Sequence, residues 1–160
     1  MKNHLILPLL VSSLLLAGCG PKDQAATTTA PASAVATFEF TANDTMKFNL
    51  TRIEVKAGQE VKIILTNTGS MPKAAMAHNW VLLKKGTDGK AFTDAAVTAL
   101  ATDYLPPALA DQVIVHTKMI GAKQSDEITF KAPTEPGEYP FVCTFPAHYL
   151  SGMHGVMVVK

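Results

Sequence analysis

Apolar and polar side chains alternate along much of the chain after residue 36. The alternation is clearest in VKIILTN (61–67) and GEYPFVCTF (137–145), and it recurs in TMKFNLT (45–51), DEITFKA (126–132) and GVMVVK (155–160). A period of two is typical of strands that bury one face. Turn-forming stretches such as KAGQ, NTGS and TEPGE separate the segments. The pattern predicts an all-β domain with its strands in an antiparallel sandwich or barrel.

The strand predicted over 137–145 carries two further details. Alternation places Tyr139, Phe141 and Cys143 on one face of that strand. Pro140 has no amide hydrogen to donate, so we expect it at an unpaired point of the sheet.

One segment, KAFTDAAVTALATDYL (90–105), departs from the strand pattern. Its small and apolar residues recur at helical spacing, and Thr93 or Asp94 could cap the start. The residues with this spacing are Ala95, Ala96, Ala99 and Leu100. We predict one short helix inserted between strands.

The N-terminus has the features of a bacterial lipoprotein signal. Lys2 precedes an apolar stretch over 5–16, which is too short for a confident membrane span, and small residues stand before Cys19. The ending LLAGC resembles a lipoprotein box, which implies removal of residues 1–18 and acylation of Cys19. The alternative is an ordinary secretory peptide that is cut elsewhere and leaves Cys19 unmodified.

The next segment predicts a tether. Residues 20–36 consist mainly of Ala, Thr, Ser and Pro, and they carry too few bulky apolar side chains to fold. We therefore divide the chain into a signal peptide (1–18), a lipidated cysteine with a flexible tether (19–36) and a folded domain (37–160). This organisation predicts an extracytoplasmic protein held at a membrane, on its periplasmic or outer side.

Composition narrows the classes of function. The chain is 48% hydrophobic and 17% charged, with a formal net charge of +1, so it can bury a core and is not a typical nucleic-acid-binding protein. It has two cysteines. If Cys19 is acylated, Cys143 has no disulfide partner, which is unusual in an oxidising compartment.

A cluster of soft side chains near the C-terminus offers a reason for this thiol. Four residues separate Cys143 from His148, and four more separate His148 from Met153. His78, in AMAHNWVLL, could supply a second imidazole from an earlier strand edge. A thiolate, two imidazoles and a weak thioether suit copper. Taken singly, each of these residues could instead be core filler or a surface residue.

The remaining histidines and Trp80 fit simpler interpretations. Trp80 is expected in the core. His116 is expected on a surface strand, and His154 should point away from a metal bound by Met153 because neighbouring strand residues face opposite ways.

Three segments resemble one known family. HNWVLL (78–83), VIVHTKMIG (113–121) and CTFPAHYLSGM (143–153) are similar to segments of cupredoxins, specifically the azurin and auracyanin group. The resemblance extends over about 38–160 and implies a Greek-key β-sandwich or barrel with one short helical insertion. The spacing between His148 and Met153 is that of auracyanins and is one residue longer than in azurins. The disulfide of azurins is missing.

The resemblance implies a ligand set for one copper ion. His78 and His148 would bind through Nδ1, Cys143 would supply a thiolate, and Met153 would be the distant axial ligand. The carbonyl of Ala77 would approach from the opposite side, where azurins have glycine.

The resemblance also implies supporting roles around these ligands. Asn79 should bond to the segment around Thr144, and the N–H groups of Asn79 and Phe145 should donate to the cysteine sulfur. An apolar patch around the His148 edge should serve electron exchange with redox proteins. Its further residues would be Met76, Pro146 and Ala147.

The leading hypothesis is a tethered, monomeric blue copper carrier that cycles between Cu(II) and Cu(I) and is not an enzyme. A copper storage, delivery or sensing module would use the same ligands, although a closed site argues against ready release. A thiol hydrolase with Cys143 as nucleophile and His148 as base would leave Met153 and His78 unexplained. Zinc could occupy such a site as an artefact of expression.

Overall fold

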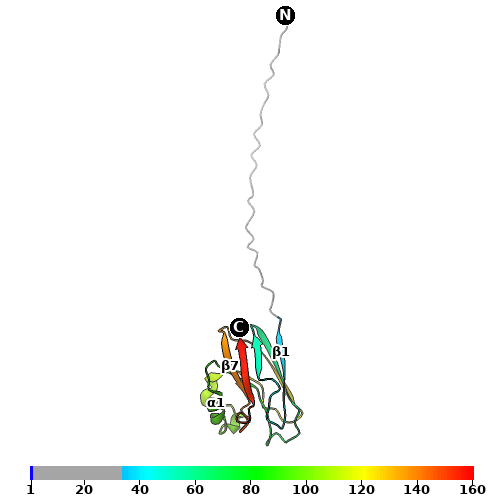
Figure 1. Ribbon diagram of the computed structural model, residues 1–160, viewed down its shortest axis with the longest axis vertical. Coiled ribbons are helices and arrows are strands. Elements are labelled where there is room, and N and C mark those ends of the chain that lie inside the picture. Colours follow the sequence, from blue (N-terminus) through cyan, green and yellow to red (C-terminus); the bar gives the residue numbers. More distant parts are fainter. Residues whose placement is uncertain (2–33) are drawn as a thin grey trace. The chain divides into compact units, whose positions relative to one another are not determined.

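The computed structural model describes Met1 and residues 34–160 (Figure 1). Three strands form the smaller of its two sheets. They are β1 (Ala36–Ala42), β3 (Glu60–Asn67) and β6 (Ser125–Lys131), in the order β1-β3-β6. Strand β3 confirms the alternation prediction, because Val61, Ile63 and Leu65 are fully buried.

The second sheet has five strands in the order β2-β8-β7-β4-β5. Their bounds are β2 (Arg52–Val55), β4 (Val81–Leu83), β5 (Val113–His116), β7 (Gly137–Val142) and β8 (His154–Val159). As predicted, Tyr139, Phe141 and Cys143 are buried together, with Cys143 one residue beyond the end of β7. Pro140 is unpaired on one side only: the register of β7 with β4 ends at Phe141, whereas on the β8 side Pro140 stands opposite Val156.

The prediction of a purely antiparallel arrangement is wrong. Strands β1 and β3 pair in parallel, and so do β2 and β8. The strand between β1 and β3 in the chain, β2, belongs to the other sheet. Because the chain leaves the sheet and returns, β1 and β3 are not joined by a tight hairpin and can run in the same direction.

The prediction of a strand over 45–51 is also wrong. This segment is a loop in which Met46 has a left-handed φ of 55° and donates its N–H to the Asn43 carbonyl at 3.0 Å. The alternation reflects Phe48, which is buried and packs edge-on against Phe40 and Phe141. A single anchored aromatic residue thus produced a strand-like pattern in a loop.

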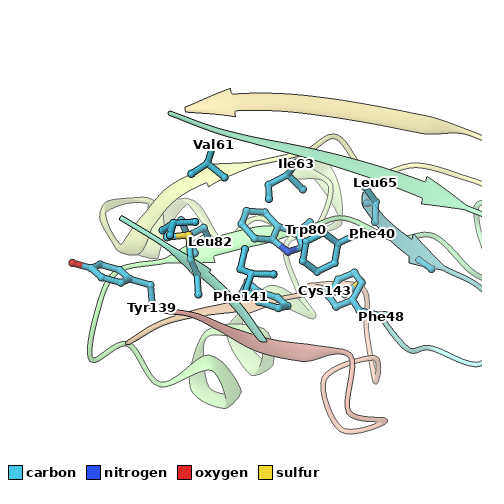
Figure 2. Packing of buried hydrophobic residues seen from close by; sticks show 14 of the residues in the cluster. Phe40, Phe48, Val61, Ile63, Leu65, Trp80, Leu82, Tyr139, Phe141 and Cys143 are labelled. Carbon is cyan, nitrogen blue, oxygen red and sulfur yellow. The ribbon is translucent and has the colours of Figure 1, made fainter. Parts of the chain in front are cut away.

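Aromatic side chains fill the space between the sheets (Figure 2). Trp80 is fully buried and stacks on Phe141, with ring centroids 5.3 Å apart. Phe40 meets the same two rings at 5.7 and 5.3 Å. This confirms Trp80 as a core residue. Each aromatic pair adds about 0.5–1.5 kcal/mol to the stability of the fold beyond the contribution of its buried area. The aromatic core is therefore a stiff support for the loops at one end of the sandwich.

The helical insertion is confirmed, with a different start. Helix α1 (Gly89–Ala96) begins after Asp88, whose carboxylate accepts from the N–H groups of Lys90 and Ala91. Thr93 and Asp94 therefore lie inside the helix and do not cap it. Phe92 packs against Val81 and Leu83 of β4 and Val142 of β7. Figure 1 shows α1 beside β7. Two short 3-10 turns, η1 (Leu100–Thr102) and η2 (Pro107–Gln112), lead on to β5.

The predicted signal peptide, Cys19 and the tether up to residue 33 lie outside the described residues. Strand β1 begins at Ala36, one residue before the predicted domain start. Among the helices that the structure describes, none has the length and apolar character required to cross a membrane.

Candidate metal centre

His78 lies three residues before β4, beyond the end of this interior strand of the larger sheet. It forms an isolated bridge with Ile120, in which the two residues exchange backbone hydrogen bonds of 3.0 and 2.8 Å. Its side chain is fully buried. The position of His78 is therefore fixed by a different segment of the chain, immediately above the aromatic core.

The loop from Cys143 to Met153 is held largely by its own backbone. The N–H of Cys143 donates to the Met153 carbonyl at 3.1 Å, and the N–H of Met153 donates to the His148 carbonyl at 3.0 Å. Ala147 adopts a left-handed φ of 68° just before His148. These bonds close the loop on itself and bring its three predicted ligand residues together.

The side chains of His78, Cys143 and His148 converge at this end of the sandwich. Their potential ligand atoms all lie within 4.8 Å of one another, and all three residues are buried. The Cys143 sulfur is 3.4 Å from Nδ1 of His148, and the two imidazole centroids are 4.9 Å apart.

The other two predicted ligand residues lie next to these three. Met153 is fully buried, and its backbone is bonded to both Cys143 and His148. Ala77 is also fully buried and directly precedes His78. His154 is exposed and stacks on Tyr149, with centroids 4.4 Å apart.

Burial sets the protonation of the cluster in the metal-free protein. It lowers the pKa of His78 to about 4, against a weaker opposing effect of the Asp44 carboxylate. Burial, helped by the nearby His78, lowers the pKa of His148 to about 4 as well. Both imidazoles are therefore neutral at pH 7 and offer lone pairs.

The thiol behaves differently from the imidazoles. Burial raises the pKa of Cys143 to about 12, although the backbone N–H groups of Asn79 and Phe145 donate to its sulfur and oppose this rise. A neutral, fully buried thiol is a poor nucleophile, which weakens the hydrolase hypothesis. A thiolate at this position needs a cation beside it.

The residues present fit a metal ion. Both ring nitrogens of His78 are buried, and the only partner near either of them among residues 34–160 is the Asn43 backbone, at a marginal contact. Buried polar atoms normally have partners, so an imidazole that leaves at least one nitrogen unpaired beside a thiol and a second imidazole marks a ligand position. Two nitrogens, one sulfur and a neighbouring thioether form the donor set that suits copper.

A reciprocal hydrogen bond joins the two ligand-bearing segments. The side-chain amide of Asn79 donates to the Thr144 hydroxyl at 2.8 Å, and its oxygen accepts from the Thr144 N–H at 2.9 Å. Both residues are buried. The neighbours of His78 and Cys143 are thus locked together.

The predicted exit patch is less open than the sequence suggested. Ala147 is exposed and Pro146 is half-buried, but only 8% of Met76 and 1% of His148 remain accessible. The Phe145 ring covers His148 at a centroid distance of 4.8 Å.

Sequence reasoning missed a segment that contacts the ligand-bearing loops. Met46 and Lys47 lie in the segment 45–51, for which the sequence predicted a strand, and Asp44 directly precedes it; Asp44 bonds to Ser70, and Met46 and Lys47 bond to Ser151. Two signals could have found them. NDT at 43–45 is a turn-forming run, and a lysine stands next to an isolated phenylalanine.

Comparisons with known proteins agree with this geometry. The model of the copper-binding plastocyanin/azurin family matches residues 34–160. Azurin of Pseudomonas chlororaphis is 39% identical over 120 residues, which cover 73% of this chain and 92% of azurin. Outer membrane protein H.8 of Neisseria meningitidis serogroup B is 44% identical over 108 residues, or 66% of this chain and 58% of that protein.

Solved structures show the same likeness. The dithionite-reduced auracyanin of Roseiflexus castenholzii superposes with a TM-score of 0.69 at 35% identity, over 78% of this chain and 97% of auracyanin. This confirms the predicted β-sandwich fold.

Proposed function

Because the chain belongs to the plastocyanin/azurin family of copper-binding proteins, with copper as its metal, we propose that it is a membrane-tethered blue copper electron carrier. Copper bound here would alternate between Cu(II) and Cu(I) as electrons pass between redox partners. The observation that carries the proposal is the buried convergence of two neutral imidazoles and one thiol within 4.8 Å.

In this proposal His78 and His148 would bind copper through Nδ1, and Cys143 would bind as the thiolate. Met153 would supply a weak thioether sulfur, supported by its full burial and its backbone bonds to Cys143 and His148. The Ala77 carbonyl would be a further, weaker contact to the metal. Loss of the thiol proton on binding makes the copper affinity depend on pH.

The chain's own contribution is rigidity. The bridge between His78 and Ile120 and the paired bonds of Asn79 and Thr144 hold the imidazole and thiol in place without metal. A site that cannot rearrange offers a compromise between the geometries preferred by the two oxidation states. Rapid electron exchange needs such a site, whereas a delivery module needs one that opens.

We further propose that electrons leave through the His148 edge, beneath a small apolar patch of Met76, Pro146 and Ala147. Ala147 is the exposed member, so partners would contact it directly. A small apolar surface favours the brief encounters that electron transfer needs. Replacing Ala147 with Lys should slow exchange with redox proteins, whereas Ala108→Lys, on the exposed 3-10 turn η2, should not. Equal rates for the two variants would contradict this route.

The tether forms the remaining part of the proposal. Cleavage before Cys19 and its acylation would anchor the domain on the extracytoplasmic side of a membrane, with residues 20–36 as a flexible spacer. The Neisseria relative is named as an outer membrane protein, which supports this location. Mass spectrometry of the membrane fraction should find Cys19 as an acylated N-terminus. An unmodified Cys19 in a soluble protein would contradict the anchor.

A visible absorption spectrum tests the copper proposal. Adding Cu(II) to the full chain should give an intense thiolate-to-copper band that ascorbate bleaches. A zinc-loaded sample is the matched control, because Zn²⁺ has a filled d shell and no redox chemistry. A colourless copper complex, or a coloured one that ascorbate does not bleach, would contradict an electron carrier.

A further inference from the structure

The loop between β1 and β2 contacts both segments that carry ligand residues. We propose that its residues 43–48 form a brace that positions these two segments, with Asp44 holding the one that leads to His78 and Lys47 holding the one that ends at Met153. The inference rests on the proposed function for its effect on copper, although the bracing can be tested without metal.

The acidic side of the brace holds residues that lead into His78. The Asp44 carboxylate accepts from the N–H of Ser70 at 2.9 Å, from the Ser70 hydroxyl at 3.0 Å and from the N–H of Met71 at 3.4 Å. These bonds lower the pKa of Asp44, with the Ser70 N–H as the largest cause. One carboxylate thus fixes a loop that the sheets do not.

The basic side holds the loop before Met153. The Lys47 ammonium donates to the Ser151 carbonyl, and a Cβ placed on Gly152 would lie only 2.7 Å from Lys47 Nζ. The Ser151 hydroxyl lies 3.1 Å from the Ala147 carbonyl and 3.5 Å from the Met46 sulfur, and its single proton can be donated to either acceptor. A charged donor on a backbone carbonyl is among the stronger hydrogen bonds in proteins.

The brace is itself anchored to the core. Phe48 is 6% exposed and packs against Phe40 and Phe141, with ring centroids 5.6 and 6.0 Å away. Lys47 is its direct neighbour, so the backbone from which the ammonium group reaches out is tied to the sandwich. The loop over 149–152 has no strand of its own, and this outside contact adds to its internal bonds.

Hydrogen–deuterium exchange of the metal-free full chain tests the brace. Three N–H groups in the loop, those of Ser151, Gly152 and Met153, donate within the loop. Lys47→Met keeps the length of the side chain but removes its donors, so these amides should exchange about tenfold faster. Asp44→Ala should accelerate exchange at Ser70 and Met71 in the same way.

Matched variants separate bracing from general destabilisation. Lys123 also donates to a backbone carbonyl, that of Thr68, at 2.8 Å, but it does not touch the loop before Met153. Lys123→Met should leave exchange over 149–153 unchanged, and Lys47→Arg should restore it. Exchange in Lys47→Met within twofold of the wild type would overturn the brace.

The copper-loaded chain tests the functional consequence. If Lys47 positions Met153, the relative intensities of the thiolate-to-copper bands should change in Lys47→Met and return in Lys47→Arg, because the axial ligand tunes such sites. Faster exchange with an unchanged spectrum would overturn the link to the copper site. A wild-type chain without a blue band would instead contradict the proposed function, while the exchange data would still decide the brace.

Discussion

The two segments that supply ligand residues are held in different ways. His78 lies in a backbone bridge with Ile120, so a distant part of the chain fixes it. The loop from Cys143 to Met153 is closed mainly by bonds among its own residues. The site therefore has one side built by the sandwich and one side built by a loop. The loop side should be the more sensitive to local substitution.

Removal of the thiol should have the largest effect, because Cys143 is where the two sides meet. Cys143→Ser should abolish the visible band. It should also lower copper affinity by more than the roughly 10- to 100-fold that loss of an outer ligand partner costs. Titration against a copper chelator measures this. A serine variant that keeps the band would place the thiolate elsewhere.

The next largest effect is expected from a substitution at Gly155, where the loop that ends at Met153 returns to the larger sheet. A Cβ at Gly155 would lie 2.3 Å from the Thr51 carbonyl and 2.4 Å from the Phe141 ring. Gly155→Ala should therefore cost about 3 kcal/mol of unfolding free energy, measured by urea denaturation. Gly86→Ala is the control, since no atom lies within 4 Å there and its left-handed φ of 80° alone should cost about 1 kcal/mol. Equal losses would mean that the loop is not docked as described.

Breaking the hydrogen bonds between Asn79 and Thr144, which join the two sides of the site, should lower stability by less. Asn79→Ala leaves buried groups of Thr144 without partners and should cost about 2 kcal/mol. Asn49 makes a similar pair of bonds, to Thr41 and Glu39, but at the exposed surface. Asn49→Ala should cost about 0.5 kcal/mol, because water replaces the lost partners. Equal losses of stability in Asn79→Ala and Asn49→Ala would contradict the larger cost expected for the buried bonds.

Acidification should produce the smallest effect near neutrality. The pKa values of His78 and His148 are lowered to about 4, so the unfolded chain binds more protons than the folded one below the usual pKa of 6.5. Stability of the metal-free protein should therefore fall as pH decreases from about 6.5 toward about 4. Urea midpoints at several pH values measure this. The copper-loaded protein should lose less, because bound imidazoles resist protonation; parallel curves would argue against histidine ligation.

Much of the fold follows from local patterns, and the exceptions have identifiable causes. Strand β3 shows its alternation because one of its faces is buried and the other is not. The parallel pairs could not be predicted, since pairing depends on which sheet each strand joins. The loop around Phe48 resembled a strand because one buried ring imposes the same local pattern.

The ligand residues of the site could be predicted from the sequence, whereas the contacts that hold the ligand-bearing loops could not. Cys143, His148 and Met153 stand close together in the chain, and His78 was proposed as the second imidazole because it stands just before an apolar strand, which the family resemblance then supported. The contacts of Asp44 and Lys47 cross sequence distances of 26 and 104 residues, and no local pattern encodes them. The cap at Asp88 was missed because the apolar spacing of the helix begins later than the helix itself.

X-ray absorption at the copper edge tests most directly whether the two segments build one site. A copper-loaded full chain should show two imidazole nitrogens and one short sulfur bond around each copper ion. The sulfur should disappear in Cys143→Ser. Copper surrounded only by nitrogen and oxygen in the wild-type chain would contradict the account, because the buried thiol between the two histidines would then play no part in binding.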